Sequence, residues 1–88
     1  MARYLIERTV GAITREELEA AALTSKRVLE GMSGVQWIRS YVSDREGKIF
    51  CEYDAPDEEA IREHARRAGL PVDRITEIAI EVSPAMFR

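Results

Sequence analysis

Apolar and polar positions alternate along several stretches of the chain, and this alternation predicts four β-strands. Residues 35–43, 48–53 and 74–82 are each interpreted as a strand whose successive side chains lie on opposite faces of a sheet. A short mixed run over 4–8 is interpreted as the strand that precedes them. Residues 44–47 end in glycine and predict a hairpin turn between the second and third strands.

Two further stretches repeat their apolar positions every three or four residues, which is typical of amphipathic helices. Thr14 and Glu17 have the spacing of a capping box, in which each side chain bonds to the other residue's backbone N–H, and Gly31 ends the helix that follows. Pro56 suits the first turn of a second helix, because its missing N–H would have no helical partner there. Gly69 ends this second helix.

The resulting order, strand-helix-strand-strand-helix-strand, predicts an α+β fold of the ferredoxin-like βαββαβ kind. In such a fold both helices cover one face of a four-stranded antiparallel sheet, and the other face is left for water or a partner. The chain of 88 residues is expected to form a single domain, 1–88, with 83–88 as a C-terminal tail. Because so short a chain buries only about 60% of its unfolded surface, we expect a homodimer.

The faces of the second strand predict where a second subunit would bind. Strict alternation places Trp37, Arg39 and Tyr41 on one face and Ile38 on the opposite face, which we assign to the helix-covered core. Glu77 is placed on the same face as Trp37. Aromatic residues and arginine are enriched at protein interfaces. We therefore expect Trp37 to lie at or beside the dimer interface.

One face of the second predicted helix centres on His64, the only histidine in the chain. The residues of this face are Asp57, Ala60, Ile61, His64, Ala65 and Ala68. His64 is therefore interpreted either as a core histidine bonded to a tyrosine or a carbonyl, or as a ligand or acid–base group in a pocket between helix and sheet. The small alanines of this face leave room for such a pocket.

Cys51, the only cysteine, alternates with Ile49 and Tyr53 on the third predicted strand. A lone cysteine on a strand is usually a small buried hydrophobe. If Cys51 lies on the helix-covered face of the sheet, the side chain of His64 points toward it from the helix. A shift of one residue in strand register would instead place Cys51 on the opposite face. Thiolate and imidazole favour nickel, zinc or copper over calcium or magnesium. Two ligands do not complete a metal site, so others would come from carboxylates, backbone groups, water or a second subunit.

Composition and charge narrow the possible partners and the location of the protein. Lysine and arginine number 13 against 16 aspartates and glutamates, which gives a net charge of −3 and predicts no nucleic-acid binding. A single cysteine cannot form an internal disulfide, which fits a reducing compartment. No signal-peptide region and no run of about 20 apolar residues is found, so a cytoplasmic protein without membrane contact is expected.

The segment CEYDAPDEEAIREHARRAGLPVDRITEI, which begins at Cys51, resembles a family of small bacterial ferredoxin-like domains that includes nickel-binding and nickel-responsive proteins. The resemblance extends from Tyr4 to about residue 82. It implies a homodimer in which two sheets approach each other to form an α/β barrel, and it implies metal binding, with nickel as the ligand. The residues that it carries over as metal ligands are His64 and Cys51, followed by Tyr53 and Glu7.

Three functions are therefore compared. The first is a homodimeric metal-binding protein for nickel, or for zinc or copper, that stores, buffers or senses the metal. The alternative is a small dimeric α/β-barrel enzyme or ligand-binding protein that uses the helix–sheet pocket around His64. The third is an interaction module whose pocket is simply core. Nucleophilic catalysis by Cys51 lacks an orienting aspartate or asparagine, so we favour a non-enzymatic role and assign no catalytic residue.

Overall fold

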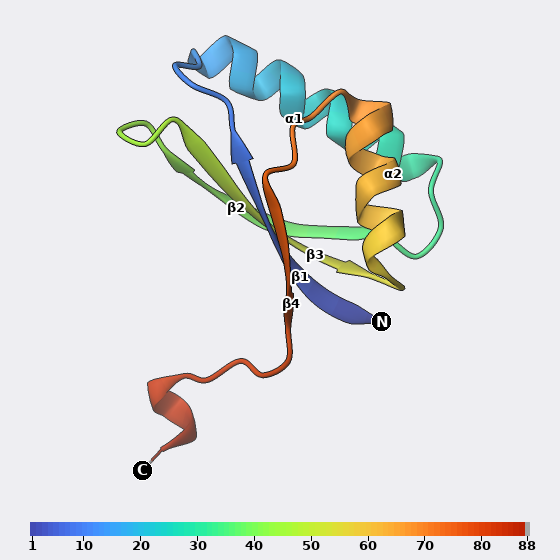
Figure 1. The fold of residues 1–88 in the computed structure, drawn as a ribbon, viewed down its shortest axis with the longest axis vertical. Helices are drawn as coiled ribbons and strands as arrows, with labels where there is room; N and C mark the ends of the chain where they lie inside the picture. The colour runs from blue at the N-terminus through green and yellow to red at the C-terminus, as the bar shows by residue number, and fades with distance from the viewer. Residues whose placement is uncertain (88) are drawn as a thin grey trace.

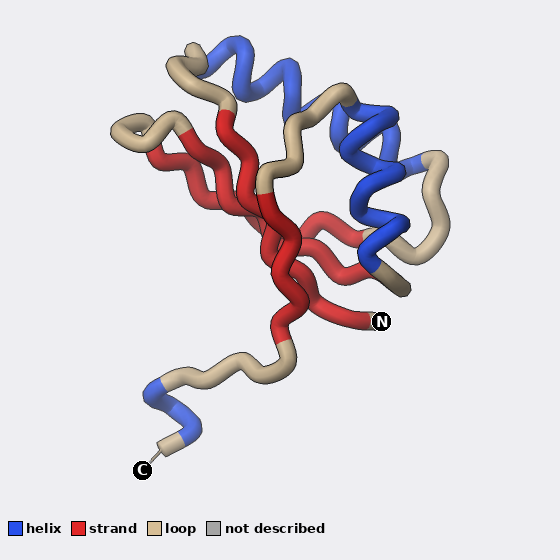
Figure 2. The backbone as a smooth tube through the Cα atoms, in the orientation of Figure 1, coloured by secondary structure: helices blue, strands red, loops and turns tan. Residues whose placement is uncertain are grey.

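The computed structural model describes residues 1–87, and its elements follow the predicted order (Figure 1). The elements are β1 (Ala2–Thr9), α1 (Arg15–Glu30), β2 (Gln36–Ser43), β3 (Lys48–Ala55), α2 (Glu58–Ala68), β4 (Arg74–Ile78) and a short 3₁₀ helix, η1 (Pro84–Met86). Both α-helices lie on the same side of the sheet, and the segment after β4 extends away from them (Figure 2). The predicted α+β fold with a four-stranded sheet is confirmed.

The four strands form one antiparallel sheet in the order β2-β3-β1-β4. This order places the two strands that begin the two halves of the chain, β1 and β3, side by side at the centre, as the ferredoxin-like arrangement requires. β1 pairs with β3 along its whole length, from the pair Ala2 and Ala55 to the pair Thr9 and Lys48. Side chains on these two central strands are therefore held in a fixed register.

Hydrogen bonds between neighbouring side chains and backbone N–H groups fix where the two helices begin. The Thr14 hydroxyl accepts a hydrogen bond from the Glu17 N–H at 3.1 Å, and the Glu17 carboxylate accepts one from the Thr14 N–H at 3.0 Å, so the capping box is confirmed. At the start of α2, the Asp57 carboxylate accepts from the Ala60 N–H at 2.8 Å. Asp57 is therefore the N-cap, and Pro56 precedes the cap instead of lying in the first turn as predicted.

The last strand is shorter than predicted, because β4 ends at Ile78 and not at residue 82. β4 is an edge strand that pairs only with β1, and the last pair joins Ile78 to Arg3 near the beginning of β1. Beyond that pair there is almost no neighbouring strand to supply hydrogen-bond partners. Ile80 and Val82 therefore leave the sheet and are exposed.

The core lies between the helices and the sheet. Its buried apolar side chains are Tyr4, Ile6, Val35, Ile49, Cys51, Tyr53, Ala55, Ile61 and Ala65. Burial alternates strictly along β3, where every second residue from Ile49 to Ala55 is buried. One face of α2 closes the core from the other side, with Ile61, His64 and Ala65 buried.

The predicted face of Trp37 is wrong. Trp37 pairs with Tyr53 of β3, but the pairing irregularity that follows leaves Ile38 as the extra residue of a β-bulge before Arg39. Because a bulge shifts the alternation by one residue, Trp37 and Ser40 both lie on the helix-covered face. Trp37 packs against the core, and its Nε1 donates a hydrogen bond to the Ser40 hydroxyl at 2.9 Å. Trp37 is therefore not part of the open sheet face.

Candidate functional site

Four polar side chains meet in the interior, one from each of β1, α1, β3 and α2. Arg8, Ser25, Tyr53 and His64 are only 1%, 3%, 1% and 0% exposed. Arg8 reaches this position because it follows Tyr4 and Ile6 on the inward face of β1, and Ser25 because it belongs to the inward face of α1. We call these four residues the buried polar cluster.

His64 is held in this cluster by Ser25 and Tyr53. Its Nε2 lies 3.0 Å from the Ser25 hydroxyl, and its ring centroid is 5.2 Å from that of Tyr53, with the planes tilted by 50°. Its Nδ1 is buried and has no hydrogen-bond partner in the described part of the chain. Burial and then the charge of Arg8 lower the pKa of His64, against a weaker opposing hydrogen bond at Ser25. The imidazole is therefore neutral at physiological pH.

Arg8 is a buried charge whose partners are a backbone carbonyl and Tyr53. Its Nη1 donates to the carbonyl oxygen of Pro71 at 2.9 Å, and its Cζ lies 6.0 Å from the centroid of the Tyr53 ring. Its Nε and Nη2 are buried and have no partner among residues 1–87. No ion pair found in those residues includes Arg8. Buried arginines are nearly always paired, so this arginine is an exception that needs an explanation.

Cys51 faces the helices, which settles the orientation that the sequence left open. It is buried, its strand position pairs with Ile6, and its thiol is free. The Ser40 hydroxyl donates to the Cys51 sulfur at 3.0 Å and itself accepts from Trp37. Cys51 and Tyr53 therefore project from the same face of β3 toward the helices.

A cavity of about 60 Å³ lies between α1 and the sheet. The residues around it include Arg8, Ser25, Trp37, Ser40, Cys51 and Tyr53, but nearly all of the surface that they present to it is apolar. We predicted that alanines of α2 would leave room beside His64, but the small residues at this cavity are Ala21 and Ala22 of α1, and His64 does not line it. The cavity therefore lies beside the buried polar cluster and is bordered by Arg8.

Glu7 lies apart from the other predicted metal ligands. It follows Ile6 on β1 and so projects from the open face of the sheet, where its carboxylate is 4.0 Å from the Arg74 guanidinium. The structure therefore brings Tyr53 and His64 into contact, places Cys51 on the same face, and leaves Glu7 on the other. Glu77, which we assigned to the open face, pairs with the buried Tyr4 and belongs to the helix-covered side.

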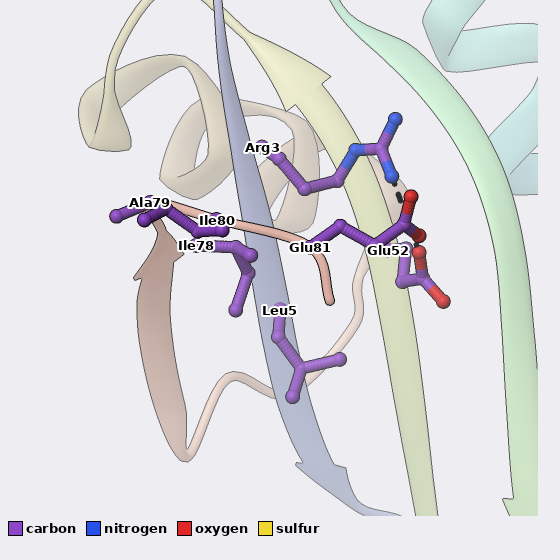
Figure 3. Close-up of a pocket in the computed structure, with 7 residues that line it drawn as sticks. All are labelled: Arg3, Leu5, Glu52, Ile78, Ala79, Ile80 and Glu81. Carbon is purple, nitrogen blue, oxygen red and sulfur yellow. Dashed lines mark hydrogen bonds and ion pairs between the residues drawn. The ribbon is translucent and has the colours of Figure 1, made fainter. Parts of the chain in front are cut away.

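The open face carries an ion-pair network and a shallow hollow of about 410 Å³ (Figure 3). Arg3 donates from Nε and Nη2 to the two carboxylate oxygens of Asp54 at 2.6 and 3.3 Å, and from Nη1 to Glu52 at 3.4 Å. The hydrogen bond from Arg3 lowers the pKa of Asp54. Ile78, Ala79, Ile80 and Glu81 line the same hollow where the chain leaves β4. This face therefore combines charged and apolar surface.

Sequence reasoning predicted the inward position of His64 but missed Arg8 as a partner. Within residues 1–87 no group of three or more histidine, cysteine, aspartate or glutamate side chains is placed to hold a metal ion. Burial raises the pKa of Tyr53, which keeps its hydroxyl protonated, and the fixed charge of Arg8 opposes a cation nearby. The described residues of one chain therefore do not form a complete nickel site.

Fold and interior together define a small ferredoxin-like α+β protein with a buried polar cluster between its helices and its sheet. A sequence model of the SCO4226-like family, described as nickel responsive proteins, matches residues 4–78, and the chain belongs to this family. No curated protein matches the chain.

Among solved structures, the chain is similar to SCO4226 from Streptomyces coelicolor A3(2), with 24% identity and a TM-score of 0.83 over 92% of this chain and 100% of that one. At this identity the likeness shows the fold. A structural genomics structure of protein YJCS is 16% identical, with a TM-score of 0.44 over 91% of this chain and 100% of the other. No helix among residues 1–87 is long and apolar enough to cross a membrane.

Proposed function

We propose that this protein binds nickel and responds to it as a homodimer, and that the two chains together complete the metal site. The observation that carries this proposal is membership of a family described as nickel responsive, over residues 4–78. A site shared between chains is consistent with the lack of a three-donor group among the described residues of one chain. We further propose a cytoplasmic location and no nucleic-acid partner, on the grounds of composition and charge given above.

The proposed donors fall into two sets. Cys51, Tyr53 and His64 form the pocket set, so called because Cys51 and Tyr53 line the cavity and His64 contacts Tyr53. The neutral imidazole of His64 has an Nδ1 without a hydrogen-bond partner among residues 1–87. Nitrogen and sulfur donors of this kind favour nickel over calcium or magnesium. Glu7 is the alternative donor on the open face, where a second chain could approach it. Because the charge of Arg8 lies near the pocket set, an ion there would need negatively charged donors, such as the Cys51 thiolate.

The proposed homodimer is a pair of open sheet faces that approach each other as an α/β barrel. The open face includes Tyr41, which is 52% exposed. The segment after β4 projects from the body of the molecule (Figure 1) and exposes Ile80, Val82, Met86 and Phe87 by 75%, 65%, 60% and 70%. Large apolar side chains gathered on one short segment are typical of an interaction surface. A second copy of the chain is the occupant that we propose.

Calorimetric titration of the metal-free protein with nickel, zinc, copper and calcium tests the proposal. We expect saturable binding of nickel and none of calcium. His64→Gln places its amide where Nε2 lies, so it keeps a partner for Ser25 but removes Nδ1, and nickel affinity should fall at least tenfold, which corresponds to about 1.4 kcal/mol. Cys51→Ser tests the second pocket donor in the same way.

Glu7→Gln is the matched variant on the other face. If Glu7→Gln loses nickel and His64→Gln keeps it, the donors are those of the open face and the pocket set is wrong. If the wild-type protein takes up no nickel at micromolar concentrations, the proposed function itself is wrong.

A further inference from the structure

We infer that Ser25 is a positioning residue, which holds His64 in the tautomer with its proton on Nε2 and leaves the lone pair of Nδ1 free. This role deepens the proposed function and rests on it, because it makes Nδ1 the atom through which His64 would bind nickel. Neighbouring atoms cover Nδ1 in the metal-free chain, and the tautomer can be measured there without any metal. The hydroxyl of Ser25, its backbone oxygen and the burial of Nδ1 all favour this tautomer.

The contact between Ser25 and His64 is a hydrogen bond whose direction decides the tautomer. The Ser25 hydroxyl lies 3.0 Å from Nε2, and either atom could supply the proton between them. A neutral imidazole carries one proton, on Nε2 or on Nδ1. If Nε2 donates to Ser25, Nδ1 is left as a bare lone pair. If Ser25 donates to Nε2, Nδ1 must carry the proton instead.

The single proton of the Ser25 hydroxyl is directed at Tyr53. Burial raises the pKa of Tyr53, and a hydrogen bond from Ser25 works against this increase. A bond that lowers the pKa of a phenol is one in which the neighbour donates to the phenol oxygen. A serine hydroxyl has one O–H and two lone pairs. Because the O–H is directed at Tyr53, Ser25 meets Nε2 with a lone pair, and Nε2 is the donor.

The backbone of Ser25 favours the same tautomer. Burial and the charge of Arg8 lower the pKa of His64, and a hydrogen bond to the backbone of Ser25 partly offsets this effect. A carbonyl oxygen can only accept, so the ring nitrogen that it meets must carry a proton. Nδ1 has no partner among residues 1–87, so the nitrogen at Ser25 is Nε2.

The burial of His64 disfavours the other tautomer. The residue is 0% exposed, and Nδ1 has no acceptor in the described part of the chain. A proton on Nδ1 would be a buried N–H without an acceptor, which is rarer in proteins than a buried acceptor without a donor. Metal-binding histidines usually donate their other ring N–H to a neighbouring oxygen, which fixes the ring. Ser25, the one buried residue of α1, provides that oxygen.

Nuclear magnetic resonance of the imidazole nitrogens tests the tautomer in the metal-free wild-type protein. His64 is the only histidine, so its two nitrogen resonances are unambiguous. At a pH well above the reference histidine pKa of about 6.5, we expect Nε2 to carry the proton and Nδ1 to give the resonance of an unprotonated nitrogen. A proton on Nδ1, or two tautomers in comparable amounts, would overturn the inference whether or not the protein binds nickel.

Ser25→Ala removes the hydroxyl, and Thr24→Ala is the matched control, because Thr24 is exposed on the same helix. We expect the Nε2 proton to exchange with solvent at least about fivefold faster in Ser25→Ala, since one hydrogen bond is lost, and at the wild-type rate in Thr24→Ala. Ser25→Thr restores the hydroxyl and should restore slow exchange, since its extra methyl group can enter the cavity that Ser25 borders. Equal exchange rates in Ser25→Ala and the wild type would overturn the role of Ser25.

Nickel titration of the same proteins separates this role from the proposed function. We expect Ser25→Ala to bind nickel about tenfold more weakly, as loss of such a supporting partner usually does, and Ser25→Thr to bind it as the wild type does. A wild type that binds nickel but has its metal-free His64 protonated on Nδ1 would overturn the role of Ser25 alone. A wild type with the proton on Nε2 that takes up no nickel would support the assigned tautomer and overturn the proposed function.

Discussion

At the scale of single residues, burial and the nearby charge of Arg8 set the protonation state of His64. Arg8 is permanently charged, so the titratable group beside it must stay neutral. Burial contributes most to the lowered pKa of His64, followed by the Arg8 charge. The groups that face His64 are Ser25 of α1, Tyr53 of β3 and Arg8 of β1. None of these offers a negative charge that would stabilise an imidazolium.

The lowered pKa of His64 predicts a stability that depends on pH. The unfolded chain takes up the proton near the reference value of about 6.5, whereas the folded chain takes it up only at lower pH. The stabilisation is therefore fully present above that reference value and is lost as pH falls through the folded pKa. We expect the free energy of unfolding, measured with urea, to fall more steeply below pH 6.5 in the wild type than in His64→Gln. Parallel pH profiles for the two proteins would contradict this account.

At the scale of elements, local signals set the helix ends and cross-strand pairing sets the strands. The capping box of α1 could be predicted because Thr14 and Glu17 are three residues apart and both of its hydrogen bonds join these two residues. The bulge after Trp37 could not, because it depends on the register of β2 against β3. The end of β4 depends on where β1 begins. Strict alternation therefore gave the wrong face for Trp37.

The parts of the candidate site that are fixed within a single helix or strand could be predicted from the sequence, and the contacts between elements could not. The helical period placed His64 on the inward face of α2, and the structure confirms its burial. Arg8 follows Tyr4 and Ile6 at a period of two, which was the available signal, but arginine is usually exposed and the pattern was not interpreted as buried. The pairing of His64 with Ser25 joins α2 to α1, and no spacing within either helix could indicate it.

The capping box predicts a measurable loss of stability. Thr14→Ala removes the side-chain acceptor of the Glu17 N–H and should lower the free energy of unfolding by about 1 kcal/mol. Thr24→Ala is the control, since Thr24 is exposed within the same helix and alanine has the higher helix propensity. Equal losses in the two variants on chemical denaturation would show that the cap does not stabilise α1.

For the two glycines that end the helices, we predict opposite effects of substitution by alanine on stability. Gly69 has a φ of 69°, and a methyl group added there would meet nothing within 4 Å, so Gly69→Ala should cost about 1–2 kcal/mol through the backbone alone. Gly31 has a φ of −95°, which alanine adopts readily, so Gly31→Ala should be neutral or slightly stabilising. Thermal unfolding of both variants measures the difference. A Gly69→Ala variant as stable as Gly31→Ala would contradict the assigned left-handed cap.

At the scale of the whole molecule, one face of the sheet is covered by helices and the other carries the ion pairs of Arg3 with Asp54 and Glu52. Figure 3 shows the pair with Glu52. The segment after β4 continues beyond this sheet and buries none of its large apolar side chains on its own chain. A homodimer through these surfaces would bury apolar area that one chain leaves exposed, and it would bring Glu7 of one chain near the other.

The projecting segment predicts how association can be weakened. In the double variant Met86→Ser and Phe87→Ser, two exposed apolar side chains that we assign to the dimer are lost. Since burial of each is worth about 1.5–3 kcal/mol, the dissociation constant should rise at least tenfold by sedimentation velocity. Leu23→Ser is the control, because Leu23 is 59% exposed on the outer side of α1. If Leu23→Ser weakens the dimer as much as the double variant does, the segment after β4 is not the interface.

Native mass spectrometry of the metal-free protein with added nickel tests the central claim most directly, because it reads subunit number and bound metal in the same ion. We predict a species of twice the 10.0 kDa mass of one chain that takes up nickel in whole-number steps and reaches a fixed maximum. The His64→Gln dimer should take up fewer nickel ions at the same concentration. A monomer at micromolar concentration, or a dimer whose bound nickel grows without a limit and equally in the variant, would contradict the account.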